Sequence, residues 1–114
     1  MGRKLVLGPI TIASAQSMAA NFNSDATVVS NEDVLSYQIN ITTSNSTGTF
    51  YLQCSNDNSN WVTIGTAGTA AAANDSIVVD IGDLSCKYMR ISYTSTIAGT
   101  GTCDILLMAR SIGA

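Results

Sequence analysis

Apolar and polar residues alternate one by one in several short stretches of the chain. The clearest is the segment 35–41, Leu-Ser-Tyr-Gln-Ile-Asn-Ile, in which every second residue is apolar. Because successive side chains of a β-strand point to opposite faces, the apolar set is predicted to face a core. The residues that this pattern predicts to face inward are Leu35, Tyr37, Ile39 and Ile41, then Phe50, Leu52 and Cys54, then Ile77, Val79 and Ile81, and finally Met89, Ile91 and Tyr93.

Turn-forming residues separate these stretches. Ser, Asn, Thr and Gly fill 43–48, and Ser, Asn and Asp fill 55–60, so both segments are predicted to be turns or loops. The small residues of 65–74 predict an exposed connection. About eight or nine short strands at this spacing predict an all-β fold, an antiparallel, jelly-roll-like β-sandwich. The predicted strands are 4–7, 10–13, 26–29, 35–41, 49–54, 61–64, 76–81, 88–93 and 102–109.

The length of 114 residues suits one compact domain. We expect 13–114 to form a single β-sandwich domain and 1–12 to form an N-terminal arm or edge strand, where Pro9 is tolerated. Two cations before a short apolar run give the start a weak likeness to a signal peptide. Gly8-Pro9 and Thr11 interrupt that run, so export by this route is not expected. No apolar run approaches the length of roughly 18 residues that a membrane span needs, so no membrane partner is expected.

The composition argues against catalysis and against nucleic acid binding. The chain has no His, which removes Ser-His and Cys-His nucleophile pairs and most catalytic zinc sites. Its carboxylates are scattered, without a pair spaced for glycoside chemistry. Nucleic acid binding needs clustered cations to neutralise phosphate groups, whereas this chain has five Lys and Arg residues against eight Asp and Glu residues, a net charge of −3. We therefore expect a protein that is not an enzyme, needs no cofactor and has no nucleic acid partner.

Neither the cysteines nor the polar loop predicts a metal site. Cys54, Cys86 and Cys103 match no metal-binding or redox spacing, and we expect them to be small, buried and reduced, with one structural disulfide as the alternative. The loop 55–60 could suggest a calcium loop. It has one carboxylate, however, and lacks the Gly and the terminal Glu of that motif, so a hydrogen-bonded turn is expected.

Two further side chains have a structural and a functional interpretation. Trp61 follows a hairpin loop, where it is expected to plug the end of the core, or alternatively to stack on a sugar or anchor a partner. Arg90 is expected to pair with Asp80 or Asp104 and to pack on Tyr88, or alternatively to bind an acidic partner.

The predicted strand and loop at 48–57, Gly-Thr-Phe-Tyr-Leu-Gln-Cys-Ser-Asn-Asp, lead to Asn-Trp at 60–61. This segment resembles a hairpin found in small phage-encoded β-sandwich proteins. The segments 87–94 and 99–102 are similar to a later strand and hairpin of the same proteins. Because these are mainly turn and core residues, they bear more on the fold than on the role. The resemblance implies a virion component: a capsid decoration or stabilising protein, or a head or tail accessory protein.

On this basis we predict a structural protein of a bacteriophage virion, assembled in the host cytoplasm. The first hypothesis is an auxiliary capsid protein that binds the outer shell, with the major capsid protein or other virion proteins and copies of itself as partners. The predicted last strand is more apolar than one small core needs, which favours a subunit interface. The candidate interface residues are Arg3, Lys4, Leu5, Leu7, Leu106 and Met108.

The alternative hypothesis is a binding module of a phage head fibre or tail. Such a module would bind carbohydrate or the host surface. Its candidate stacking platforms are Trp61, Tyr51 and Tyr88.

Overall fold

The computed structural model describes residues 3–28, 34–70, 73–82, 86–97 and 99–113. In this part of the chain the residues form nine β-strands and no helix, as the alternating pattern predicts. The strands are β1 (Arg3–Ser17), β2 (Phe22–Asn23), β3 (Thr27–Val28), β4 (Val34–Thr42), β5 (Thr47–Ser55), β6 (Val62–Ala70), β7 (Asp75–Gly82), β8 (Tyr88–Ile97) and β9 (Thr102–Gly113).

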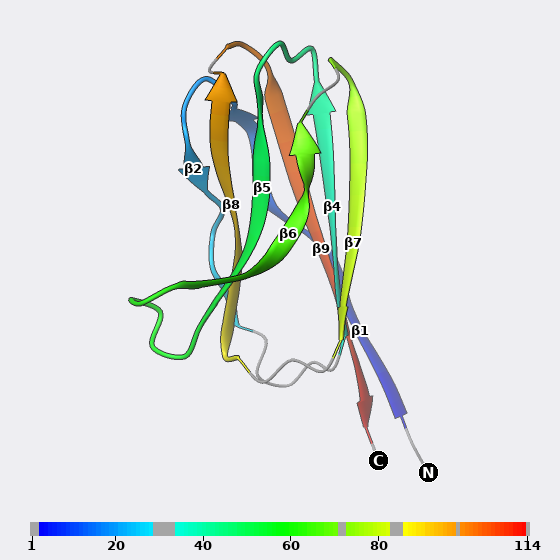
Figure 1. The fold of residues 1–114 in the computed structure, drawn as a ribbon. Helices are drawn as coiled ribbons and strands as arrows, with labels where there is room; N and C mark the ends of the chain where they lie inside the picture. Colours follow the sequence, from blue (N-terminus) through cyan, green and yellow to red (C-terminus); the bar gives the residue numbers. More distant parts are fainter. Residues whose placement is uncertain (1–2, 29–33, 71–72, 83–85, 98, 114) are drawn as a thin grey trace.

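The strands form two antiparallel sheets that pack face to face (Figure 1). The first sheet has the order β1-β9-β4-β7, and the second has the order β2-β8-β5-β6, with β3 also paired to β8. Counting β2 and β3 as one interrupted strand, the first strand pairs with the last, the second with the second-last, and so on inward to the β5–β6 hairpin. The chain is thus one long antiparallel hairpin that is rolled into two layers. This is the jelly-roll arrangement, so the predicted fold class is confirmed.

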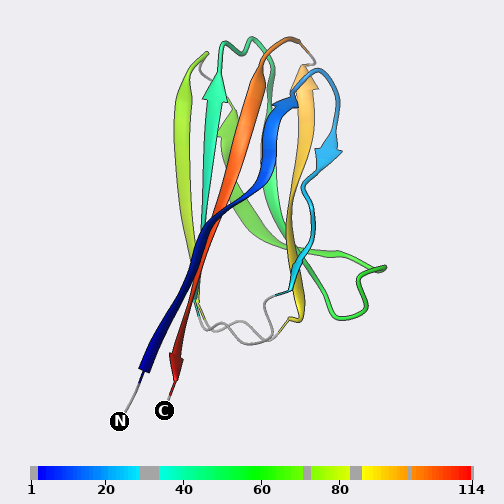
Figure 2. The same cartoon turned by 180° about the vertical axis from the view of Figure 1, so that it is seen from behind.

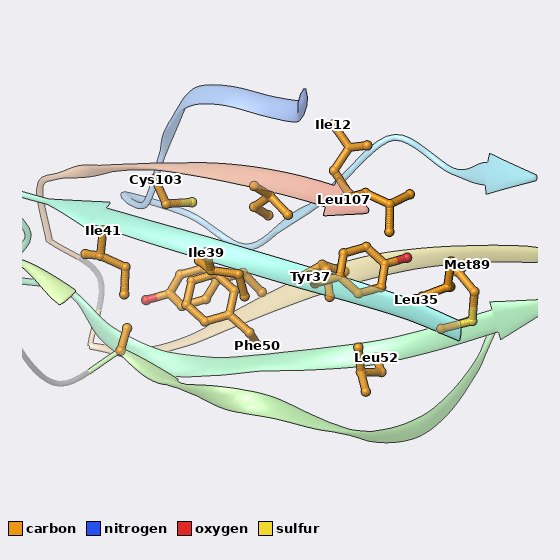
Figure 3. Close-up of a cluster of buried hydrophobic side chains, with 14 of the residues drawn as sticks. Ile12, Leu35, Tyr37, Ile39, Ile41, Phe50, Leu52, Met89, Cys103 and Leu107 are labelled. Carbon is orange, nitrogen blue, oxygen red and sulfur yellow. The ribbon is translucent and has the colours of Figure 1, made fainter. Parts of the chain in front are cut away.

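Alternate residues of the central strands fill the space between the sheets (Figure 3). The predicted inward residues of β4, β5 and β8 are all buried, whereas those of the edge strand β7 are half-buried and pack against the core. Burying a large apolar side chain stabilises the fold by about 1.5–3 kcal/mol. Phe50 and Tyr93 lie at the centre, with ring centroids 4.7 Å apart. The period of two therefore determines which side chains form this core.

Polar groups inside the sandwich mostly find partners. The Ser46 hydroxyl donates to the Met18 carbonyl at 2.9 Å, and the Ser24 hydroxyl accepts from the Ile91 amide at 2.9 Å. The hydroxyls of Tyr37 and Tyr93 are different, because neither has a hydrogen-bond partner among the described residues. Burial raises the pKa of both phenols above the ordinary value, so both stay neutral at physiological pH.

The predicted connection at 65–74 is wrong for its first part, because β6 continues to Ala70. Small residues let this edge strand of the second sheet approach β7, the edge strand of the first. At Gly68, an added Cβ would lie 2.8 Å from the Ile77 side chain. The run of Gly, Ala and Thr thus serves close packing of two edges, which its composition alone does not distinguish from a loop.

Candidate functional site

The aromatic residues divide into a buried group and a surface group. Tyr37, Phe50 and Tyr93 are fully buried, and Phe22 packs against them. Tyr51, Trp61 and Tyr88 remain half-buried. The alternating burial of β5 and β8 places Tyr51 and Tyr88 on the outer face of the second sheet. The three predicted stacking residues therefore belong to one region, which we call the aromatic platform: Tyr51, Gln53, Trp61, Tyr88 and Arg90.

Trp61 and Arg90 lie against each other at the centre of the aromatic platform. The guanidinium carbon of Arg90 is 4.2 Å from the centroid of the Trp61 ring, which is a close cation–π contact. The prediction that Trp61 plugs the core is wrong. It fails because the tip of the β5–β6 hairpin extends across the lower end of β8 (Figure 1), and Trp61 there contacts Arg90, an outward-facing residue of β8.

The predicted partners of Arg90 are also wrong. Arg90 lies opposite Gln53 in the β5–β8 register, and its Nε donates to Gln53 Oε1 at 2.8 Å. Gln53 Nε2 in turn donates to Thr63 Oγ1 at 3.2 Å. Asp80 and Asp104 belong to the first sheet, so neither lies beside Arg90. A chain of side-chain hydrogen bonds thus fixes Arg90 across three strands.

The loop 55–60 beside the aromatic platform is a hydrogen-bonded turn, as expected. The Asp57 carboxylate accepts from the amides of Ser59 and Asn60, at 2.9 and 2.8 Å, and from the side chains of Asn60 and Ser55. These bonds hold the pKa of Asp57 well below its usual range, with the Asn60 amide as the largest cause. The carboxylate therefore serves the turn. Among the described residues, no group of three or more carboxylates and thiols is placed to hold a metal ion.

A disulfide joins Cys54 and Cys86, with Cα atoms 5.9 Å apart, so the expectation of reduced cysteines is wrong. The cause is the β5–β8 pairing, which brings the end of β5 to the residues just before β8. Cys103 is free and buried. Burial, with a smaller contribution from the charge of Asp104, raises the pKa of Cys103 to about 12, so this thiol stays protonated and unreactive. The disulfide anchors the same end of the second sheet that carries the aromatic platform.

Positive charge gathers at the aromatic platform, although the chain is acidic overall. Lys87 directly precedes β8, and its Nζ lies 5.5 Å from the centroid of the Tyr88 ring. Tyr88 is two residues before Arg90 in β8 and therefore points to the same face. The Lys87 amide donates to Asn56 Oδ1 at 3.0 Å, which ties the loop to the start of β8. Desolvation lowers the pKa of Arg90, but a guanidinium titrates so high that it remains charged. Two cations and three aromatic rings therefore share one surface.

The residues predicted as an interface lie on the first sheet. Arg3, Lys4, Leu5 and Leu7 are in β1 and pair with residues 113, 112, 111 and 109 of β9. The β4–β9 pairing ends at Val34↔Arg110, so among the described residues the segment 111–113 has a strand partner only in β1. We call the paired segments 3–7 and 109–113 the β1–β9 ribbon. It projects beyond the lower end of the sandwich (Figures 1 and 2).

A break in the β1–β9 register separates this ribbon from the sandwich. The register shifts between Leu7 and Ile10, at Gly8-Pro9. Such a bulge bends an edge strand. Beyond it Ile12 is buried in the core, so the sandwich includes at least this residue of the predicted arm. Two further register shifts follow in β1, between Thr11 and Ala13 and between Ala13 and Gln16.

The other two interface residues lie on the outer face of the first sheet. Leu106 is half-buried and Met108 is 43% exposed. The alternate residues Ile105 and Leu107 point the other way, into the core. In the β4 register Leu106 lies opposite Gln38, and Met108 lies opposite Ser36. The described structure therefore brings Leu106 and Met108 to one face of the sheet, and the ribbon begins at the next residue of β9. No helix in the described residues is long and apolar enough to span a membrane.

Sequence reasoning missed Gln53, Thr63 and Lys87 as neighbours of the aromatic residues. Gln53 alternates with Leu52 and Cys54, which placed it on the outer face from the sequence. Its contact with Arg90 depends on the pairing of β5 with β8, two strands separated along the chain by β6 and β7. The sequence could therefore predict that Gln53 points outward, but it could not predict that Arg90 is its partner.

No protein-family model matches the sequence, and no curated protein matches it in sequence. The fold itself has known counterparts. The chain is similar in structure to the PBSX exported protein XepA, with a TM-score of 0.60, 14% identity and 98% of this chain covered. It spans only 38% of that protein. The SPBc2 prophage-derived protein YomS matches with a TM-score of 0.53 and 12% identity, over 99% of this chain and 96% of YomS.

A third similar structure comes from a xylanase. It is the Clostridium thermocellum endo-1,4-beta-D-xylanase 10B CBM22-1–GH10 structure complexed with xylohexaose. Its TM-score is 0.50 at 12% identity, with 90% of this chain and 28% of that chain covered. At such identities the three similarities establish a shared β-sandwich fold.

Proposed function

We propose that this chain is a non-catalytic structural protein of a phage particle, which assembles through the β1–β9 ribbon. YomS supports the phage origin, because a protein described as prophage-derived consists almost entirely of the same fold. The resemblance of the hairpin at 48–61 to phage β-sandwich proteins points the same way. The observation that carries the role in assembly is the end of the ribbon, because the outer edges of its segments 3–5 and 111–113 have no partner among the described residues.

A two-stranded ribbon is a weak structure by itself. Isolated two-stranded hairpins are marginally stable in water, and an open strand edge presents unpaired amide and carbonyl groups. Among the described residues, the segments 3–5 and 111–113 pair only with each other, so the outer edge of each segment is open. Contact with another molecule would satisfy these groups, and strand addition is a common way to do so.

Charge indicates which surface receives the ribbon. Its segments 3–7 and 109–113 contain Arg3, Lys4 and Arg110, three of the five Lys and Arg residues of the chain, and none of the eight Asp and Glu residues. Two ribbons side by side would repel, whereas a ribbon on the acidic body of the next copy would attract. A head-to-tail contact of this kind closes into rings or extends into open filaments, so a single type of contact links many copies. We propose the outer capsid shell as its location and the major capsid protein as a further partner.

The test measures the mass of the assembly. Analytical ultracentrifugation of the full chain should detect multimers that dissociate as salt rises, because exposed charge pairs are screened. The double variant R3Q/K4Q should lower the multimer fraction. The control T94E/T96E makes the same net charge change of −2 at exposed positions of β8 and should retain it. A full chain that is monomeric at every concentration would contradict the proposal. Mass spectrometry of purified particles should then give a copy number close to that of the shell subunit.

The second candidate function is carbohydrate binding, favoured by the gathering of Tyr51, Trp61 and Tyr88 on one outer face. The C. thermocellum structure that shares this fold was complexed with xylohexaose, which supports the fold's suitability for glycans. Trp61 is the only Trp, so its fluorescence reports directly on this surface. We expect a panel of cell-wall glycans to include at least one that shifts its emission. A flat response to the whole panel would remove this candidate.

A further inference from the structure

We infer that the aromatic platform binds an acidic carbohydrate, with Arg90 contacting the sugar carboxylate and the aromatic rings stacking on the sugar faces. The inference rests on the second proposed function, carbohydrate binding, and is independent of assembly through the ribbon. It assigns a ligand class to Tyr51, Gln53, Trp61, Tyr88 and Arg90, and it makes Arg90 the residue that decides specificity.

The distribution of aromatic side chains is the first argument. The chain has seven Phe, Trp and Tyr residues, four of which belong to or pack on the core. All three others are on the aromatic platform. Partly exposed Tyr and Trp rings offer an apolar face together with a polar edge, which matches the C–H faces and hydroxyls of a sugar. Ser92, which lies opposite Tyr51 and is half-buried, adds a hydroxyl to the same outer face.

The state of Arg90 is the second argument. Its Nε is occupied by Gln53, and its Nη groups make no hydrogen bond to the described residues. Those Nη groups carry further N–H donors, which fit the two oxygens of a carboxylate. No Asp or Glu occurs in β5, β6 or β8, the three strands that form this surface. The one carboxylate of the loop 55–60, that of Asp57, accepts hydrogen bonds from Ser59 and Asn60 within the turn. An anionic ligand would meet two cations, Lys87 and Arg90.

Rigidity is the third argument. The Cys54–Cys86 disulfide, the Asp57 turn and the Arg90–Gln53–Thr63 hydrogen bonds all fix this end of the hairpin. Binding then orders few side chains, which reduces the entropy lost on association. A hairpin tip that only connected two strands would need none of these three devices.

The experiment uses affinity electrophoresis and Trp61 fluorescence with the full chain. The probes are polygalacturonate and the same polymer with its carboxylates methyl-esterified. Polygalacturonate should retard the protein and shift Trp61 emission, and the ester should bind about tenfold more weakly, as expected for loss of a charged hydrogen bond. Equal binding of both polymers would overturn acid specificity while leaving carbohydrate binding intact. Binding of neither would overturn both, without bearing on assembly.

Variants assign the contact to Arg90. R90Q should lower the affinity for polygalacturonate about tenfold or more, whereas T42E makes the same net charge change of −1 at an exposed position of β4, in the first sheet, and should leave affinity within about twofold. Y51A tests the aromatic contribution without touching the Trp61–Arg90 contact and should weaken binding several-fold. Full affinity in both R90Q and Y51A would overturn the inference. Polyglutamate, which has carboxylates but no sugar, should compete poorly. Competition equal to polygalacturonate would make the ligand an acidic peptide and overturn it as well.

Discussion

The β1–β9 ribbon and the β5–β6 hairpin tip beside the aromatic platform are both at the lower end of the sandwich (Figures 1 and 2). The ribbon and the platform are held in opposite ways. The ribbon is maintained by a backbone ladder between two strands, and the outer edges of its segments 3–5 and 111–113 have no partner among the described residues. The aromatic platform is maintained by a disulfide and by side-chain hydrogen bonds. A region whose backbone amide and carbonyl groups lack hydrogen-bond partners is suited to pairing with another protein chain. A region whose polar groups are already hydrogen-bonded and whose aromatic rings are partly exposed is suited to binding a ligand.

Removing the disulfide should affect the aromatic platform most. The bond spans 32 residues of sequence, so its loss should lower the free energy of unfolding by about 3–4 kcal/mol. We expect C54S/C86S to show this loss in urea unfolding and a changed Trp61 emission in the folded state. Its multimer mass should equal that of the full chain. If the variant lost its assembly while Trp61 emission stayed constant, the division between the two regions would be wrong.

A change in the shared core should affect neither region selectively. The Tyr37 hydroxyl is buried without a hydrogen-bond partner among the described residues. Because an unsatisfied buried polar group costs about 1–3 kcal/mol, Y37F should be more stable than the parent chain by an amount in this range. Assembly and Trp61 emission should not change. A less stable Y37F would mean that the hydroxyl contributes an interaction.

The same residue predicts an alkaline effect. Burial raises the pKa of Tyr37 above that of an unfolded tyrosine, which is about 10. The native state therefore resists ionisation, and its stability is complete below the unfolded pKa and falls as pH rises through and above it. Urea unfolding between pH 8 and about 11 should show this decline, and the decline should be smaller in Y37F. Equal slopes in the two proteins would contradict the assignment.

The sequence was most informative where one physical rule determined the outcome. Alternation predicted the core of β4, β5 and β8, because a strand with one buried face can place its apolar residues only one way. It was least informative about contacts between strands distant in sequence. The Cys54–Cys86 bond and the Arg90–Gln53 contact both follow from the β5–β8 pairing. Trp61 was misplaced because its position depends on how the hairpin tip bends, which no periodicity encodes.

Mild acid is the smallest perturbation, and it should leave the aromatic platform unchanged. Hydrogen bonds hold the pKa of Asp57 well below its ordinary value of about 4. A carboxylate with a lowered pKa contributes stability that is complete above the unfolded pKa and is lost as pH falls through the lower folded pKa. Trp61 emission should therefore stay constant from pH 7 to about 3, a range in which an ordinary carboxylate titrates.

Two variants separate the turn from general acid effects on Trp61. D57N removes the charge that the amides of Ser59 and Asn60 contact, so its Trp61 emission should differ from that of the parent chain already at pH 7. D80N changes an exposed carboxylate in β7, on the first sheet, and should match the parent throughout. A transition of parent emission centred near pH 4 would show that the turn does not protect this carboxylate. The aromatic platform would then lack the rigidity that distinguishes it from the ribbon.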